Sequence, residues 1–197
     1  MINPHLLIPG MITAVTSPHI VCKGIKYILS RPDDPCLTCH NGMVVRRYGM
    51  WGTVDPVPPR VVFRPLQELE RMIERGYSMQ FLWPDKAKIQ QGQRAADGMV
   101  KTIGNDYPEL TVARLMILKF WSQYPREIRS RQEFKDRHQW KEWCTLSVRN
   151  RWRDEGGDDW STKSDGREKP NPTPKTAQNR VRSGRLSLVY QVLAGAR

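Results

Sequence analysis

The densest group of chemically reactive side chains lies in the segment Cys36-Leu37-Thr38-Cys39-His40. This segment has the C-x-x-C-H form of a c-type haem attachment site, in which two thiols bond the haem and the histidine ligates the iron. Together with Cys22, it also offers four side chains of the kinds that zinc accepts. We prefer a third interpretation, reduced thiols of an intracellular protein, because no export signal and no second C-x-x-C pair is visible. Cys36, Cys39 and His40 are therefore only weak candidates for metal or haem, and no metal is predicted.

The chain carries a large excess of positive charge. Its 197 residues contain 32 Lys and Arg against 20 Asp and Glu, which gives a formal net charge of +12. Residues 1–118 hold 14 basic and 10 acidic side chains, whereas residues 119–197 hold 18 and 10, so most of the excess lies in the second part. Such a charge favours a polyanionic partner, of which nucleic acid is the commonest. The alternative is a basic protein that binds no polyanion.

Arginines in the second part of the chain are interleaved with Trp140, Trp143 and Trp152. Arginine neutralises phosphate and an aromatic ring can stack on an unpaired base, so the pattern predicts contact with DNA. Acidic residues share the segment, and a solvated helix with i,i+4 ion pairs explains the charges equally well. For the tryptophans we prefer core packing. The arginines predicted here to contact nucleic acid are Arg126, Arg129, Arg131, Arg149, Arg151 and Arg153.

The distribution of proline, glycine and apolar residues predicts an α+β fold, with a small irregular β-rich recognition region followed by helices and a basic, partly disordered C-terminal tail. No apolar run is long enough for a transmembrane helix, and Met1–Gly10 lacks the basic start of a secretory signal. We therefore expect an intracellular protein without a membrane partner, in the cytoplasm or wherever the DNA is. The chain divides into a β-rich region (1–60), a helical region (61–121), a basic aromatic helix (122–153) and a disordered linker with a short terminal element (154–197).

Helical periodicity is clear at one place in the chain. Apolar residues recur at helical spacing from Leu66 to Arg75, and Gly76 supplies a stop. Residues 85–107 are polar and contain glycine, which predicts a loop. The other expectations are a helix over 108–121 that begins at a proline, a helix over 130–146 that begins with a capping box, disorder over 154–182 and a short apolar element over 186–193.

A wider series of short motifs follows in a fixed order along residues 18–118. The chain resembles, in this order and at these distances, the C-terminal part of a cytosine-5 DNA methyltransferase, which comprises the target-recognition region and the closing motifs. The family's segments D-x-P-x-x-T, R-x-L and G-N-x-x-P each have a counterpart here. The matching stretches are Asp33-Asp34-Pro35-Cys36-Leu37-Thr38, Asn41-Gly42-Met43-Val44, Phe63-Arg64-Pro65-Leu66, Phe81-Leu82-Trp83-Pro84 and Ile103-Gly104-Asn105-Asp106-Tyr107-Pro108.

The resemblance implies a DNA-binding chain that is not catalytic alone. The chain lacks the family's glycine-rich turn for S-adenosylmethionine, its Pro-Cys-Gln nucleophile and its Glu-Asn-Val acid, and we interpret Cys36 as non-catalytic. If a catalytic partner supplied the rest of the pocket, Gly104 and Asn105 would border S-adenosylmethionine; the alternative is that they only form a turn. Arg46 and Arg47 would contact phosphate or guanine, with at most one of the two reading a base because neighbours on a strand point to opposite faces.

Three functional hypotheses follow, and the first is preferred. It is a DNA-binding protein built on the recognition half of a cytosine-5 DNA methyltransferase, at most one part of a split enzyme whose other subunit carries the catalytic motifs. The second is a small basic nucleic-acid-binding or host-interaction protein unrelated to methyltransferases. The third is a haem or zinc protein centred on the C-x-x-C-H segment. No catalytic nucleophile is identified from the sequence.

Overall fold

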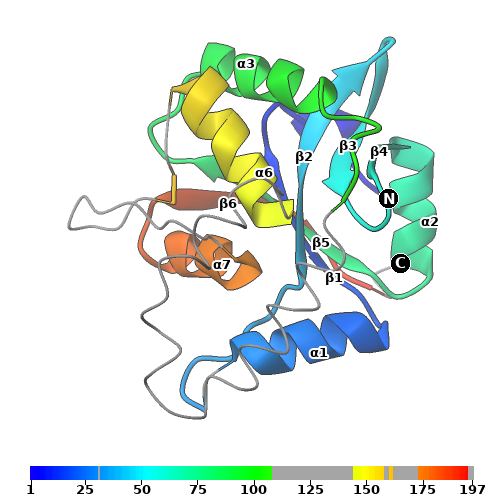
Figure 1. Cartoon of the computed structure of the whole chain (residues 1–197), viewed down its shortest axis with the longest axis vertical. Coiled ribbons are helices and arrows are strands. Elements are labelled where there is room, and N and C mark those ends of the chain that lie inside the picture. The colour runs from blue at the N-terminus through cyan, green and yellow to red at the C-terminus, as the bar shows by residue number, and fades with distance from the viewer. Residues whose placement is uncertain (31, 108–143, 158–159, 162–172, 195–197) are drawn as a thin grey trace.

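Six antiparallel strands form one sheet, in the order β4-β3-β2-β1-β5-β6. The computed structural model describes residues 1–30, 32–107, 144–157, 160–161 and 173–194 (Figure 1). A tight hairpin turn joins β2 to β3, and Tyr48 and Gly49 both take the positive φ that such a turn requires. The strands are β1 (Ile12–Thr16), β2 (His40–Arg47), β3 (Met50–Pro56), β4 (Val61–Pro65), β5 (Ser78–Pro84) and β6 (Leu186–Val192).

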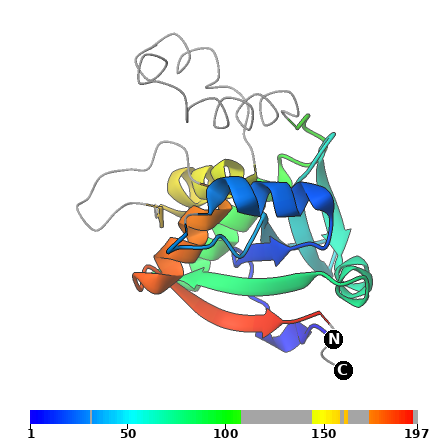
Figure 2. The same ribbon diagram turned by 90° about the horizontal axis from the view of Figure 1, so that it is seen from below.

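The inner strands of this sheet are buried on both faces. Successive side chains of a strand point to opposite faces, so that Ile12 and Met43 enter one core while Val15 and Val44 enter the other. The first core is covered by α3, α6 and α7, and the second by α2 and the N-terminal segment, on opposite sides of the sheet (Figures 1 and 2). The helical elements are η1 (Pro4–Leu6), α1 (Ile20–Leu29), α2 (Leu66–Glu74), α3 (Ile89–Val100), α6 (Cys144–Arg151), η3 (Trp152–Gly156) and α7 (Pro174–Arg182).

The predicted α+β class is confirmed, and so is the helix expected from Leu66. In α2, Leu69 and Ile73 lie four residues apart and are both buried, which is the i,i+4 spacing of one helical face. Gly76 has a φ of +91°, a conformation that ends the helix at little cost only for glycine. The apolar run expected near the end of the chain is β6, the outermost strand beside β5.

Residues 85–107 do not form only the predicted loop, because α3 occupies Ile89–Val100. Its buried face is made of small residues and Met99, so few large apolar side chains mark this helix in the sequence. The small residues let the helix approach closely: a methyl group at Gly92 would lie 2.4 Å from the Trp83 ring and 2.6 Å from the Pro9 carbonyl oxygen. Glycine in this segment therefore marks close packing of a helix rather than a break in it.

The C-terminal part corrects a second prediction. Disorder was expected over 154–182, but α7 occupies Pro174–Arg182 and begins with a reciprocal Thr173–Thr176 capping box. Asp34 holds the helix in place through ion pairs with Lys175, at 2.8 Å, and with Arg182. These two cations hold the pKa of Asp34 below its ordinary value, mainly through their hydrogen bonds to the carboxylate. The helix predicted over 108–121, and nearly all of the one over 130–146, lie outside the described residues.

Trp152 joins the helical layer to the N-terminal segment. Its side chain is fully buried, packs edge-to-face on Trp83 at 5.4 Å between ring centroids and donates its indole N–H to the Gly10 carbonyl oxygen at 2.9 Å. The core packing preferred for this tryptophan is confirmed, whereas Trp140 and Trp143 lie outside the described residues. Within the described part of the chain, no helix is both long and apolar enough to cross a membrane.

Candidate active site

A thiol, an imidazole and a carboxylate meet at one end of the sheet. His40 is the first residue of β2, Asp55 lies near the end of the adjacent strand β3, and Cys144 is the first described residue of α6. The β2–β3 register pairs Met43 with Val54, and its continuation places Asp55 opposite Gly42, two residues from His40 on the same face. The side chain of Asp55 can therefore reach diagonally across the strand pair to His40.

Glycine at position 42 is what leaves room for this reach. A Cβ atom built on Gly42 would lie 2.0 Å from Asp55 Oδ1 and 2.9 Å from Thr13 Oγ1, far inside van der Waals contact. Any side chain at this position would displace the carboxylate. Gly42 therefore positions Asp55 sterically, without taking part in the chemistry.

The carboxylate of Asp55 is fixed on all sides. Its Oδ1 lies 3.2 Å from His40 Nε2, while Oδ2 accepts a hydrogen bond from Thr53 Oγ1 at 2.8 Å and lies 3.3 Å from Arg64 Nε. The Asp55 side chain is only 6% exposed, whereas that of His40 is 19% exposed and so keeps an opening to solvent. Because Nε2 is engaged by Asp55, Nδ1 is the imidazole nitrogen that remains for the hydrogen bond between His40 and the Cys144 thiol.

Cys144 is held against β2 by its neighbours as well as by His40. The residue is 7% exposed, and the backbone of Asn41 hydrogen-bonds to its sulfur. The next residue, Thr145, donates its hydroxyl to Asn41 Oδ1 at 2.8 Å, and the Asn41 amide donates to the Thr13 carbonyl oxygen at 3.0 Å. These buried contacts fix α6 relative to the strand that carries the imidazole.

The electrostatics of the site favour an ion pair between thiolate and imidazolium. Burial by itself raises the pKa of the Cys144 thiol, but the neighbouring His40 charge and hydrogen bonds to the sulfur outweigh burial and hold this pKa below its ordinary value. Burial lowers the pKa of His40, but Cys144 and Asp55 raise it to about 10. Burial likewise opposes ionisation of Asp55, yet His40, Arg64 and Thr53 keep the pKa of that carboxyl lowered.

Tyr107 completes the surroundings of the sulfur. Its hydroxyl forms a hydrogen bond with the backbone of Cys144, and its own backbone N–H donates to the Pro59 carbonyl oxygen at 2.7 Å. Burial raises the pKa of the Tyr107 hydroxyl, so the phenol stays protonated. A neutral O–H beside the sulfur can donate to an oxygen that develops negative charge there.

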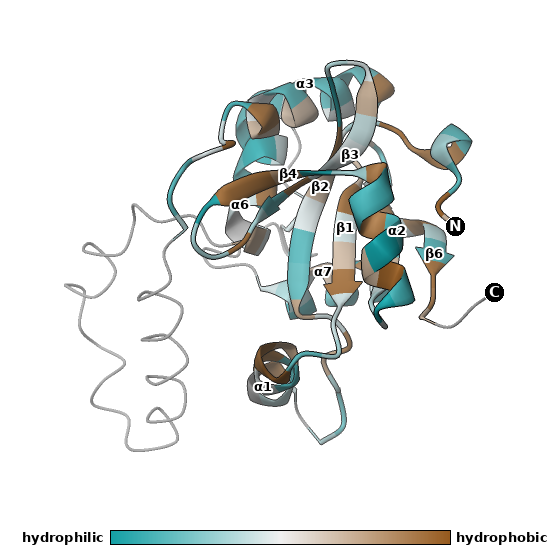
Figure 3. Cartoon of the chain, turned by 90° about the vertical axis from the view of Figure 1, so that its right-hand side faces the viewer, coloured by the Kyte–Doolittle hydropathy of each residue, from teal (hydrophilic) through white to brown (hydrophobic). Residues whose placement is uncertain are grey.

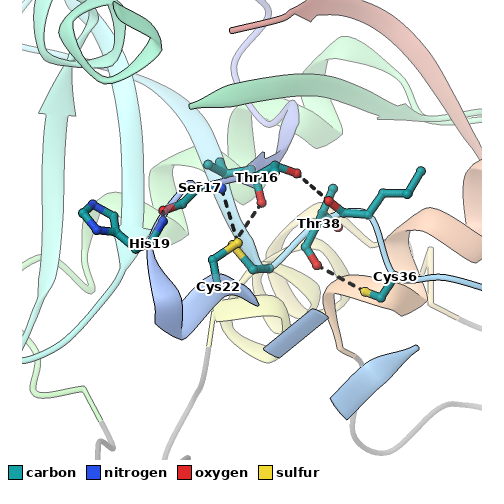
Figure 4. The surroundings of a disulfide bond; sticks show 9 residues. Thr16, Ser17, His19, Cys22, Cys36 and Thr38 are labelled. Carbon is teal, nitrogen blue, oxygen red and sulfur yellow. Dashed lines mark hydrogen bonds between the residues drawn. A yellow bond between two sulfur atoms is a disulfide. The ribbon is translucent and has the colours of Figure 1, made fainter. Parts of the chain in front are cut away.

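The structure separates the members of the C-x-x-C-H segment. Cys39 forms a disulfide with Cys22, which corrects the expectation of reduced thiols at these two positions. The Cys36 thiol donates to the Thr38 carbonyl oxygen at 3.2 Å (Figure 4). His40 instead contacts Asp55 and Cys144. The described residues contain no group of three or more His, Cys, Asp or Glu side chains that could hold a metal ion.

Gly104 and Asn105 form a turn that follows α3. The Gly104 N–H donates to the Val61 carbonyl oxygen at 2.9 Å, and the Val61 N–H donates to Asn105 oxygen at 2.9 Å, so the turn is tied to the start of β4. Gly104 has a φ of +92°, which accounts for glycine at this position. The turn that the sequence left as an alternative is therefore present, and contact of these two residues with S-adenosylmethionine stays a prediction.

The arginines predicted to bind nucleic acid lie in different environments. Arg46 and Arg47 belong to the end of β2, where their guanidinium groups stack on Trp51 and Tyr48, at 5.8 and 4.9 Å from the ring centroids. Arg149 is only 3% exposed. Arg151 Nη1 lies 3.8 Å from Glu155, and Arg153 Nε pairs with Asp154 at 2.5 Å. The other three predicted arginines, Arg126, Arg129 and Arg131, lie outside the described residues. The burial of Arg149 leaves it little surface for a phosphate.

Sequence reasoning missed Cys144 and Asp55 as site residues, and named His40 for a different chemistry. Cys144 has no motif around it, and about a hundred residues separate it from His40. Asp55 stands in Val54-Asp55-Pro56, a sequence that by itself indicates nothing catalytic. The one available signal was a spare cysteine together with a histidine elsewhere in the chain, a combination that can form a nucleophile and base only after folding.

Comparisons with known proteins give a distant structural likeness. No family model matches the sequence, and no curated protein matches it. Among solved structures, the chain is similar to the metalloprotein yiiX from Escherichia coli O157:H7, described as DUF1105, with a TM-score of 0.48 and 15% sequence identity. The match covers 95% of this chain and 89% of that one.

Proposed function

We propose that this protein is a cysteine-dependent acyl hydrolase or acyltransferase, with Cys144 as nucleophile, His40 as general acid and base, and Asp55 as the group that orients His40. The observation that carries the proposal is the convergence of these three side chains: Asp55 Oδ1 lies 3.2 Å from Nε2 of the imidazole, and the imidazole also hydrogen-bonds to the Cys144 thiol. The same combination of thiol, imidazole and an orienting polar group operates in papain-like proteases.

The reaction follows from the positions of these groups. The Cys144 thiolate attacks the carbonyl carbon of an amide, ester or thioester, and the tetrahedral oxyanion forms beside the Tyr107 hydroxyl. When the bond to the leaving group breaks, His40 supplies its proton and an acyl–sulfur bond remains. Water, or another acceptor with a hydroxyl or amine, then attacks the acyl group while His40 takes its proton, and the acyl–sulfur bond breaks to restore the pair of Cys144 thiolate and His40 imidazolium.

Alkylation by iodoacetamide tests the nucleophile. Because the pKa of the Cys144 thiol is lowered, its alkylation should begin at a lower pH than that of an ordinary thiol, and mass spectrometry of the digested protein locates the adduct. His40→Ala should abolish this alkylation at lower pH, and Cys36→Ser serves as the matched control because it removes the other buried thiol without touching the site. Alkylation at lower pH that survives His40→Ala, or no alkylation of Cys144, would contradict the proposal.

Turnover requires a second experiment. A panel of amides, esters and thioesters of short acyl groups should reveal hydrolysis that disappears in Cys144→Ala, with a covalent acyl-enzyme of the corresponding mass in the wild-type protein. Retention of all hydrolysis by Cys144→Ala would refute the assignment of the nucleophile.

DNA binding is retained as a second candidate function, supported by one surface feature. The end of β2 carries Arg46 and Arg47, and the turn that follows carries Tyr48, which is 83% exposed at a positive φ of 50°, on a chain with a net charge of +12. Arginine and an exposed aromatic ring suit a nucleic acid backbone and an unpaired base. Binding to random duplex and single-stranded DNA at two salt concentrations should weaken in Arg46→Gln and Arg47→Gln if this proposal is correct.

The methyltransferase relationship and the intracellular location both stay predictions. A split enzyme would need a partner subunit that supplies S-adenosylmethionine binding and the catalytic motifs, and co-purification from the natural source tests for such a partner. The Cys22–Cys39 disulfide favours an oxidising compartment, because thiols are kept reduced in the cytosol. Cell fractionation with a tagged chain distinguishes the predicted intracellular location from an oxidising compartment.

A further inference from the structure

Helix α1 (Ile20–Leu29) exposes the apolar side chains that a helix normally buries. Ile20, Val21 and Tyr27 are 83%, 64% and 77% exposed, respectively. Cys22, on the opposite side, is buried and disulfide-bonded to Cys39. Figure 3 shows α1 set apart from the layers that cover the sheet, with the brown colour of apolar residues along part of its ribbon. A helix with apolar residues around most of its circumference requires a further apolar environment on its outer side.

The charges of α1 indicate what kind of environment this is. The helix contains Lys23 and Lys26 and no acidic residue, and Lys23 is exposed next to the apolar side chains. Helices that lie in a membrane surface combine such a lysine-bearing side with an apolar side, and tyrosine suits the boundary because its ring is apolar and its hydroxyl is polar. The net charge of +12 adds a general attraction to anionic lipid headgroups.

The position of α1 connects this surface to the candidate active site. The disulfide joins Cys22 of α1 to Cys39, and the residue after Cys39 is His40. Figure 4 shows the disulfide region, where the Ser17 N–H donates to Cys22 Sγ and the Thr16 hydroxyl donates to the Leu37 carbonyl oxygen. The apolar helix is therefore anchored at the same end of β2 as the imidazole.

We infer that the exposed face of α1 docks the protein on an anionic lipid surface and that the acyl substrate of the Cys144 site is a membrane lipid. The second half of this inference rests on the proposed function, whereas the first half does not. Ile20, Val21 and Tyr27 enter the boundary between headgroups and acyl chains, and Lys23 contacts the headgroups. This arrangement presents ester or amide carbonyls of lipids near the end of the sheet where His40 lies.

Co-sedimentation with vesicles tests the docking surface. Vesicles of phosphatidylcholine and phosphatidylserine in equal parts should bind the full chain, and vesicles of phosphatidylcholine alone should bind it more weakly. The double variant Ile20→Ser with Tyr27→Ser should bind at least about tenfold more weakly, because burial of one large apolar side chain is worth about that factor or more. Val189→Ser is the matched control, since Val189 is also exposed, at 44%, but lies on β6.

Three results would overturn the inference about docking. The first is absence of vesicle binding, and the second is equal binding by the double variant and the wild type. The third is that the wild type forms a dimer in solution whereas the double variant is a monomer. The last result would show that a second copy of the chain covers α1. Circular dichroism and thermal unfolding confirm that each variant is folded.

The two proposals fail in distinguishable ways. Iodoacetamide alkylation of Cys144 should be the same in the double variant and the wild type, because α1 does not contribute to the site chemistry. Vesicle binding without alkylation of Cys144 would remove the proposed function and the lipid substrate but leave the docking surface. Rapid alkylation without vesicle binding would leave the hydrolase and refute the docking. Release of fatty acid from the bound vesicles, lost in Cys144→Ala, is expected if the lipid is the substrate.

Discussion

Replacing Asp55 with asparagine tests the charge that supports the imidazolium. The substitution preserves the size of the side chain and an oxygen that can accept from His40 Nε2, but removes the negative charge. At the observed 3.2 Å, Coulomb's law with an effective dielectric constant of about 20 gives roughly 5 kcal/mol between unit charges. Desolvation and the remaining hydrogen bond reduce the net effect, and a neighbouring charge usually shifts a pKa by about 1–3 units.

The sign of the change follows from the pKa of His40, which is raised to about 10 in the wild-type protein. Without the carboxylate, the imidazolium should lose its proton about 1–3 pH units lower. Arg64, 3.3 Å from Asp55 Oδ2, would lose this carboxylate but keep its ion pair with Glu68, so its less compensated positive charge acts in the same direction. Because His40 then carries its positive charge over a narrower pH range, it stabilises the Cys144 thiolate less, so the pKa of the thiol should rise.

Two assays separate these two changes. The rate of alkylation of Cys144 against pH reports the thiol, and its rise should move to higher pH in Asp55→Asn. The rate of hydrolysis also needs a protonated His40 for the leaving group, so its alkaline limb should move to lower pH. Asp97→Asn is the control, because Asp97 is exposed on α3 and its carboxylate bonds only to Gln93 among the described contacts. A folded Asp55→Asn variant with the wild-type pH window would refute the role given to Asp55.

Three further substitutions, the first with a control variant, test positioning and packing. Gly42→Ala should reduce activity strongly because its methyl group displaces the Asp55 carboxylate. The control is Gly24→Ala, whose methyl group would meet nothing within 4 Å; it should leave activity unchanged and the Tm equal or higher. Thr145→Val should cost about 1–3 kcal/mol in urea unfolding, since it leaves a buried acceptor of Asn41 unpaired, and should lower hydrolysis under conditions where the variant is folded. Trp152→Ala should cost about 3–5 kcal/mol in the same unfolding measurement, and a cost below 1 kcal/mol would contradict its role in the core.

The sequence predicted those helices and strands whose formation depends on residues close together in the chain. The helix α2 combines an i,i+4 apolar pair with a terminal glycine, and β6 is a short apolar run, so both were visible before the fold was known. The helix α3 was not, because its buried face consists of small residues whose purpose is close approach to Trp83 and Pro9. The helix α7 was missed because its packing depends on ion pairs with Asp34, about 140 residues away in the chain.

The candidate site was predictable only in part for a similar reason. His40 attracted attention through the neighbouring cysteines, but those cysteines belong to a disulfide and to a backbone contact, not to the partners of the imidazole. Its real partners come from β3 and α6, and no spacing rule relates them to it. Antiparallel pairing brings Asp55 near, and packing of α6 on β2 brings Cys144.

The order of the site residues along the chain has a consequence for biosynthesis. The base and its carboxylate lie in the first third of the chain, whereas the nucleophile follows about a hundred residues after the base. At translation speeds of about 5–20 residues per second, several seconds pass between the emergence of His40 and that of Cys144 from the ribosome. During this interval the strands β1 to β5 can pair while the thiol is still absent, so a nascent chain cannot form an acyl-enzyme. The strand β6 emerges later still, and until it pairs with β5 that edge of the sheet is open to a chaperone or to another nascent chain.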